Sequence, residues 1–174
     1  HASATCNPAF HTTGSHYLNV DSTAFCQLLE SNVFRDFPRL RVVITHGGGN
    51  VPYQAARYRA LCLMNRWEPF ETFVRRLYFD TTVYSQEAME LLVRVVGVDN
   101  LLFASEMLGG VNTTDPATGR AFDDNRACLE GISWLGPEDR RKIFETNARI
   151  AYPRLGPLLD QRLAGRGAVA AGEA

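Results

Sequence analysis

The residues best suited to chemistry in this sequence stand where two apolar runs end. His46 opens the stretch Thr45-His46-Gly47-Gly48-Gly49-Asn50 directly after the apolar residues 40–44, and Glu106 follows the apolar residues 101–105. Imidazoles and carboxylates are common proton-transfer groups, and glycines let backbone N–H groups approach a ligand closely. The pattern predicts a functional site. Each residue also has a purely structural interpretation. His46 could simply precede a tight left-handed turn, and Glu106 could be a solvated side chain at the end of a strand.

Apolar periodicity indicates the elements that must position these residues. It predicts strands at 41–45, 77–83 and 101–105. Helices are expected at 21–33, from Pro52 to about 61, and at 68–75, 87–96, 123–135, 137–148 and 153–163. Because strands and helices alternate, the sequence predicts an α/β fold with a parallel sheet, in which side chains at the carboxyl ends of neighbouring strands share one edge. His46 and Glu106 are therefore expected to lie together.

The length of the chain limits how much of a barrel it can form. A closed (β/α)₈ barrel needs about 250 residues, whereas this sequence has 174 and three complete predicted strands. We therefore expect about half of a TIM barrel, or else a small open sheet, over residues 1–163. Residues 164–174, rich in Gly and Ala, are expected to be a disordered tail. The chain starts with His1 instead of Met, and our working assumption is that it was cut from something longer.

Composition indicates an ordinary globular protein. The chain is 45% hydrophobic and 21% charged, its formal net charge is −1, and its 18 Lys and Arg residues are scattered. This balance argues against a nucleic-acid partner. The four cysteines form no CxxC pair, and no apolar run has the length of a membrane span. The expectation is a cytoplasmic protein with reduced cysteines and neither nucleic-acid nor membrane partners.

An ordered series of motifs carries a family resemblance. The motifs are Cys6-Asn7-Pro8, His11-Thr12-Thr13-Gly14, His16-Tyr17-Leu18-Asn19, Phe37-Pro38-Arg39-Leu40, His46-Gly47-Gly48-Gly49, Pro52-Tyr53, Leu102-Phe103-Ala104-Ser105-Glu106-Met107, Asp115-Pro116, Phe122-Asp123-Asp124, Asn147-Ala148-Arg149 and Tyr152-Pro153. Together they resemble the metal-dependent amidohydrolase superfamily, in the branch of decarboxylases and hydratases of aromatic degradation, and in particular its 4-oxalomesaconate hydratase group. The resemblance covers nearly the whole chain except the tail.

The resemblance implies a metal site with ligands from both halves of a barrel. His1 matches the strand-five histidine that binds zinc or another divalent metal in the family, although a terminal histidine could also be frayed and solvated. The family's HxH metal pair belongs to the first strands, and no HxH occurs in this sequence. His46 matches the strand-six histidine beside the metal, where the glycines that follow could offer N–H donors to a substrate carboxylate.

The same resemblance implies roles for several other residues. Glu106 occupies the strand-eight position, where it could act as a general base and then return a proton to carbon. Arg57 could bind a carboxylate with its guanidinium or simply be solvated, and Tyr17 and Asn7 could donate hydrogen bonds to substrate. Asp80 could orient a neighbouring histidine or cap a helix.

Three functions remain open at this point. The first is metal-dependent hydration of an unsaturated keto polycarboxylate, a small-molecule substrate, by a hydro-lyase. The second is a nonoxidative decarboxylase of the same superfamily. The third is a truncated, catalytically inactive chain or assembly partner, because half of a barrel leaves two edge strands and an uncovered apolar sheet, which favours association into an oligomer.

Overall fold

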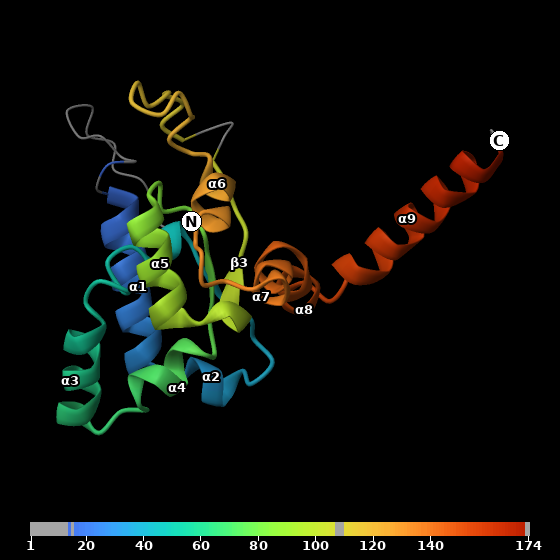
Figure 1. Ribbon diagram of the computed structural model, residues 1–174. Coiled ribbons are helices and arrows are strands. Elements are labelled where there is room, and N and C mark those ends of the chain that lie inside the picture. Colours follow the sequence, from blue (N-terminus) through green and yellow to red (C-terminus); the bar gives the residue numbers. More distant parts are fainter. Residues whose placement is uncertain (1–13, 15, 107–109, 173–174) are drawn as a thin grey trace.

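The computed structural model describes residues 14, 16–106 and 110–172, and in these residues a three-stranded parallel sheet forms the centre (Figure 1). The strands are β1 (Val43–Ile44), β2 (Tyr78–Asp80) and β3 (Leu101–Leu102), and they are paired in the order β1-β2-β3. Ile44 is in register with Phe79, and Phe79 with Leu101. Neighbouring strands are thus consecutive in the sequence, as they are in a (β/α)₈ barrel, and each crossover contains helices.

The helices flank and follow this sheet. They are α1 (Tyr17–Glu30), α2 (Val33–Asp36), α3 (Ala55–Asn65), α4 (Phe70–Val74), α5 (Gln86–Val96), α6 (Asn125–Glu130), α7 (Pro137–Arg141), α8 (Asn147–Ala151) and α9 (Leu155–Gly172). A π-helical turn at Lys142–Thr146 joins α7 to α8. The alternating order predicted from the sequence is therefore confirmed, and α5 ends as expected at Gly97, where φ is 87°.

The strands are shorter than predicted because side chains replace the backbone ladder at their carboxyl ends. Thr81 follows β2, and its hydroxyl accepts a hydrogen bond from Ala104 N at 2.9 Å and donates one to Ala104 O at 3.1 Å. Asp80 accepts a bond from Thr82 N at 3.1 Å, which turns the chain away from the sheet. Residues 81–83 and 103–105 are therefore loops held by side chains, and they were wrongly predicted to continue the strands.

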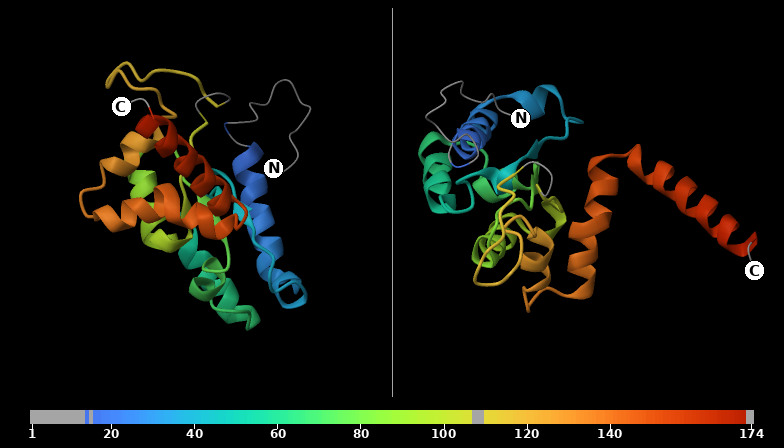
Figure 2. Two further views of the ribbon diagram at one scale, coloured as in Figure 1. Left: turned by 90° about the vertical axis from the view of Figure 1, so that its right-hand side faces the viewer. Right: turned by 90° about the horizontal axis from the view of Figure 1, so that it is seen from above.

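Some helix bounds also differ from the predicted ones. Helix α1 begins at Tyr17, four residues before Asp21, and α3 begins at Ala55, so that Pro52 lies in the preceding turn. Helix α9 continues to Gly172, where a disordered tail from Ala164 was expected. Alanine has the highest helix propensity, which favours this continuation. In Figures 1 and 2, α9 extends away from the rest of the molecule.

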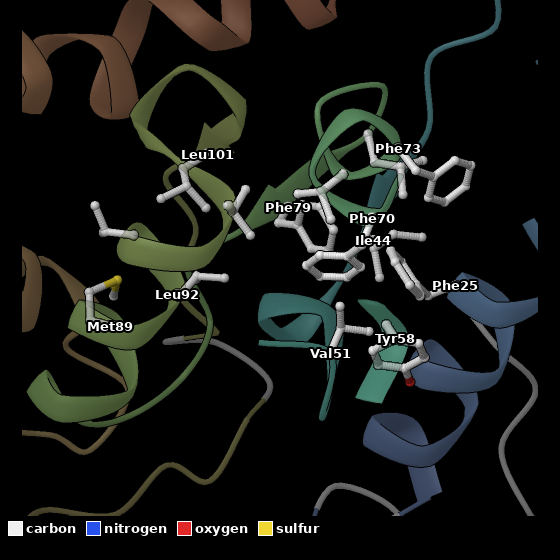
Figure 3. Close-up of a cluster of buried hydrophobic side chains, with 14 of the residues drawn as sticks. Phe25, Ile44, Val51, Tyr58, Phe70, Phe73, Phe79, Met89, Leu92 and Leu101 are labelled. Atoms are coloured by element: carbon white, nitrogen blue, oxygen red, sulfur yellow. The ribbon is translucent and has the colours of Figure 1, made fainter. Parts of the chain in front are cut away.

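An aromatic cluster forms the core between α1, α3, α4 and β2 (Figure 3). Phe25 of α1 lies at its centre, fully buried, with its ring centroid 5.0 Å from that of Tyr58, 5.5 Å from Phe73 and 6.4 Å from Phe79. The contacts with Tyr58 and Phe73 are edge-to-face and the one with Phe79 is tilted, and such oriented contacts favour a single arrangement of the rings. The cluster therefore fixes α1 relative to β2, and with it the residues that α1 presents to the carboxyl end of the sheet.

The outer edge of β3 is covered by the segment from α7 to α8, which lies beside it (Figure 1). The buried Asn147 side chain donates to Val98 O at 2.6 Å and to Leu101 O at 2.8 Å. Phe103 N donates to Ile143 O at 3.0 Å, within the π-helical turn. These bonds satisfy backbone groups at the strand edge.

None of the helices in the described ranges has the length and apolarity that a membrane crossing would need.

Candidate active site

The carboxyl ends of the three strands and helix α1 bring four ionisable side chains together. His46 follows β1, Asp80 ends β2, and Glu106 lies four residues after β3. Asp21 comes from the first half of α1 and is buried there. The edge-sharing predicted from the sequence is confirmed, since His46 and Glu106 contact each other directly.

The imidazole of His46 bridges two carboxylates. Its Nδ1 lies 2.6 Å from Asp21 Oδ2, and its Nε2 lies 3.2 Å from Glu106 Oε1. The hydrogen bond with Asp21 raises the pKa of His46, with further support from the charges of Asp21, Asp80 and Glu106, while burial opposes the rise. A raised pKa favours the imidazolium, in which both ring nitrogens donate. Asp21, His46 and Glu106 thus form a continuous hydrogen-bonded series.

The buried end and the middle of this series are held by further contacts. Thr45 donates its hydroxyl hydrogen to Asp21 Oδ1 at 3.0 Å, so each oxygen of that carboxylate has a partner. The ring of Tyr17 stacks on the imidazole of His46, with 5.6 Å between the centroids and 8° between the planes. These contacts fix the imidazole in position and plane.

The glycine turn after His46 approaches protein groups, not a ligand. All four residues from His46 to Gly49 have positive φ angles, between 50° and 83°. A Cβ atom on Gly48 would lie 2.7 Å from the Phe79 ring, and one on Gly49 would lie 2.2 Å from Leu18 O. Glycine is therefore required by the packing of β2 and α1 against the turn.

The backbone N–H groups of this turn are already bonded within the protein. Gly47 N donates to Asp80 Oδ1 at 3.0 Å, Gly48 N to Thr45 O at 2.9 Å, Gly49 N to His46 O at 3.0 Å, and Asn50 N to Ser22 Oγ at 2.9 Å. The expectation that the glycines offer N–H donors to a substrate carboxylate is therefore wrong. Their role is to let the turn fold closely against α1 and β2.

Asp80 holds the glycine turn in place. Its Oδ1 accepts bonds from Gly47 N and Thr82 N, which link the ends of β1 and β2. Burial raises the pKa of the Asp80 carboxyl, while these hydrogen bonds oppose the rise. Two roles were considered for Asp80, capping a helix and orienting the histidine. Asp80 caps no helix. It holds His46 in position indirectly, through its hydrogen bond with the backbone of the turn.

Glu106 is the part of the series that solvent can reach. Its side chain is 26% exposed, compared with 6% for that of His46. Tyr84 donates its phenolic hydrogen to Glu106 Oε2, so both carboxylate oxygens have a partner. A cavity of 380 Å³ opens at this point. It is lined by Gly14, Leu18, His46, Gly49, Thr82, Val83, Tyr84, Ala88, Glu106 and Val111.

The cavity is apolar on most sides and has acid–base groups at one wall. The described residues that line it include no Lys or Arg. Arg57 lies on the exposed surface of α3, where its Nε donates to Gln54 at 3.1 Å, so the structure does not bring it to this cavity. His1 and Asn7 lie outside the described residues. Their expected contacts with metal and substrate remain predictions.

The described residues do not form a metal site by themselves. Within residues 14, 16–106 and 110–172, no three His, Cys, Asp or Glu side chains are grouped so that they could hold an ion. Both ring nitrogens of His46 are engaged with carboxylates. The described residues alone therefore do not supply the ligand set that the resemblance implies, and His1, the ligand expected from this chain, lies outside them.

Two residues of the site were missed from the sequence. Asp21 was interpreted only as the start of a helix, and Tyr84 was given no role. The signal for Asp21 is a carboxylate among the apolar positions of an amphipathic helix, because an unpaired acid is disfavoured on a buried face. For Tyr84 we find no comparable signal, since its approach to Glu106 depends on a positive φ of 58°.

Known proteins share this architecture. A 2-keto-4-carboxy-3-hexenedioate hydratase of Sphingobium sp. (strain NBRC 103272 / SYK-6) is 44% identical over 163 residues, which cover 93% of this chain and 48% of the relative. The crystal structure of 4-oxalomesaconate hydratase from Rhodopseudomonas palustris superposes with a TM-score of 0.80 at 45% identity, covering 91% of this chain and 47% of that one. A 2-amino-3-carboxymuconate-6-semialdehyde decarboxylase of Dictyostelium discoideum is 30% identical over 82 residues, which are 42% of this chain and 23% of the relative.

The chain spans about half the length of the two hydratases. The parallel sheet with flanking helices in this chain corresponds to about half of a (β/α) barrel of this kind. The family model described as amidohydrolase matches residues 5–154, which include every element from α1 to α8 and all four ionisable residues of the site. On this match and on the architecture that it accompanies, the chain belongs to the amidohydrolase family.

Proposed function

We propose that the protein is a hydro-lyase that adds water to an unsaturated keto polycarboxylate of the 4-oxalomesaconate type, in the degradation of aromatic compounds. The observation that carries this proposal is the series Asp21–His46–Glu106, which is buried at one end and opens into a cavity at the other. The hydratase activity in the names of the two relatives at 44% and 45% identity supports the same class of reaction.

Hydration requires one group that can take a proton and then return it. Water adds across a carbon–carbon double bond as a hydroxyl on one carbon and a hydrogen on the other. Glu106 faces the cavity, so its carboxylate can accept the proton of water as the C–O bond forms, and then deliver that proton to the neighbouring carbon. The keto group, conjugated with the double bond, holds the negative charge between these two steps.

His46 and Asp21 prepare Glu106 for this exchange. The imidazolium donates to Glu106 Oε1 and so holds this carboxylate beside the cavity with a charge-assisted hydrogen bond. Asp21 balances the charge of the imidazolium from its buried side and holds Nδ1. The contact between His46 and Glu106 also provides a path by which a proton can be shared while the substrate carbon is not yet in position.

The test is the replacement Glu106→Gln, which keeps the shape of the side chain and removes its basicity. We expect the turnover of 4-oxalomesaconate, followed as loss of its conjugated absorbance, to fall by about 10²–10⁴-fold. Glu130→Gln on α6, with a side chain 46% exposed, is the matched control and should keep full activity. Undiminished turnover in Glu106→Gln would reject the proposed role.

The alternative function is nonoxidative decarboxylation, which the partial match to a decarboxylase favours. The two reactions differ in their products, because only decarboxylation releases carbon dioxide. Loss of conjugated absorbance without carbon dioxide supports hydration, and stoichiometric carbon dioxide supports the alternative.

A further inference from the structure

Tyr84 has a backbone conformation that few aromatic residues adopt. It lies between β2 and α5 with a φ of 58°. A bulky residue in this region is a conformational outlier that the surrounding structure must hold in place. Surrounding groups hold it there. Tyr84 N donates to Asn125 Oδ1 at 3.2 Å, and the fully buried Asn125 donates in turn to Ala104 O at 3.3 Å. The strained residue is thereby tied to the loop that follows β3.

The strained backbone aims the phenol at Glu106. The Tyr84 hydroxyl donates to Glu106 Oε2, and His46 Nε2 contacts Oε1 of the same carboxylate. One partner on each oxygen, from two different loops, fixes the rotation of the carboxylate about its terminal bond. A single partner would leave that torsion free, because it is broad in glutamate.

Gly110 closes over this pair. A Cβ atom on Gly110 would lie 2.5 Å from the Tyr84 hydroxyl oxygen and 2.7 Å from Glu106 Cβ. Such distances are too short for any larger residue without displacing one of the two side chains. Gly110 is therefore packed directly on the contact between Tyr84 and Glu106, which is the arrangement expected where a side chain must be held in one orientation.

The phenol keeps its hydrogen under working conditions. Burial, followed by the hydrogen bond with Glu106 and the charge of that residue, raises the pKa of Tyr84. The hydroxyl therefore remains a donor at neutral pH and above, and the carboxylate remains the acceptor.

We propose that Tyr84 is a positioning residue for the hydration reaction: its hydroxyl holds the Glu106 carboxylate in the orientation in which one oxygen faces the cavity for proton exchange. This inference rests on the proposed function of Glu106 and adds a residue to it. Tyr84 acts through Glu106, so its removal should slow turnover and leave substrate affinity nearly unchanged.

The first experiment is Tyr84→Phe, which keeps the ring and removes the donor. We expect kcat to fall by about 10–100-fold, the usual effect of losing a group that orients a catalytic residue, while KM changes less than about twofold. Tyr53→Phe, at a residue that is 78% exposed, is the control and should match the wild type. An unchanged kcat with a lower thermal midpoint would show that the contact is only structural and would overturn the proposal.

A double-mutant cycle then tests whether Tyr84 acts through Glu106. In a protein that already carries Glu106→Gln, adding Tyr84→Phe should lower kcat by less than about twofold, because the group that Tyr84 positions is no longer basic. If the two losses multiply instead, Tyr84 has an independent role, and the proposal is wrong as stated.

An NMR titration tests the contact without any activity. With ¹³C-labelled tyrosine, the Tyr84 resonance, assigned by its absence in Tyr84→Phe, should titrate at lower pH in Glu106→Gln than in the wild type. Glu130→Gln should leave it unchanged. The same titration curve in Glu106→Gln and wild type would remove the basis of the inference. Full activity of Glu106→Gln would instead contradict the proposed function, so the two failures are distinguishable.

Discussion

A histidine between two carboxylates is the central feature of this protein at the scale of residues. His46 is 6% exposed, and it meets Asp21 on its buried side and Glu106 on its cavity side. A buried imidazolium without partners would be costly, but here each N–H has a carboxylate acceptor. The arrangement makes the protonation of His46 depend on Asp21 more than on any other group.

We therefore expect Asp21→Asn to lower the pKa of His46. The variant removes the strongest contribution to the raised value and leaves burial, which opposes it. The measurement is a ¹⁵N NMR titration of the imidazole, assigned with His46→Gln. Asp36→Asn, at a surface residue paired with Arg35, is the control and should not shift the curve. A His46 titration that is identical in Asp21→Asn and wild type contradicts this account of the site.

The same pair makes stability depend on pH in a definite direction. The folded-state pKa of His46 is raised above the ordinary value of 6.5 for histidine, so its contribution to stability is complete below about pH 6.5. That contribution is lost as the pH rises through the folded-state pKa. The difference in unfolding free energy between wild type and Asp21→Asn, from urea denaturation, should accordingly shrink with rising pH over this range. A difference that grows with pH would reverse the sign of the linkage.

At the scale of elements, the turn of three glycines is a junction between β1, β2 and α1. Gly49 has φ 61° and ψ −118°, which essentially only glycine adopts. A Cβ atom on Gly49 would lie 2.2 Å from Leu18 O and 2.6 Å from Ser22 Oγ. The turn thus connects the conformation of His46 to the position of α1, which carries Asp21.

Gly49→Ala should destabilise the fold by about 2 kcal/mol or more, because backbone strain and a clash with backbone act together. Gly136→Ala is the matched control, since its Cβ atom would have Asp139 Oδ2, at 4.0 Å, as its nearest neighbour. Urea denaturation of both variants measures the difference. Equal stability of Gly49→Ala and wild type would show that the turn can relax, and that it does not hold α1 against β1.

At the scale of the whole molecule, one aromatic core holds the site together. The core packs α1, α3 and α4 against β2, whereas the site lies at the carboxyl ends of the strands above it. Asp21 and Phe25 are one helical turn apart on α1, and both are buried. Packing of Phe25 in the core therefore determines how closely Asp21 approaches His46.

Phe25→Ala should lower the unfolding free energy by about 3–5 kcal/mol, the range for removing a buried phenylalanine ring. Phe37→Ala, at a residue that is 63% exposed, should have little effect. Thermal and urea denaturation provide the measurement, and the ¹⁵N titration of His46 in Phe25→Ala reports whether Asp21 has moved. A loss below about 1 kcal/mol would mean that the core can close around the missing ring, contrary to its tight packing.

The amino-acid sequence by itself determined the alternation of helices and strands, the parallel sheet, and the shared edge of His46 and Glu106. Apolar periodicity and glycine turns are local signals, and the carboxyl ends of adjacent parallel strands must lie at one edge. The family also follows from the ordered motifs. Each of these conclusions depends on neighbouring residues or on a rule of topology.

Only the tertiary structure decided which groups complete the site. Asp21 lies 25 positions from His46, and Tyr84 lies 22 positions from Glu106. Such contacts depend on how α1 packs through Phe25 and on a strained backbone at Tyr84, which no local pattern encodes. The glycine N–H groups proved to be bonded to other groups of the protein, and Arg57 lies away from the cavity. The direction of a donor or a side chain is set by the packing around it.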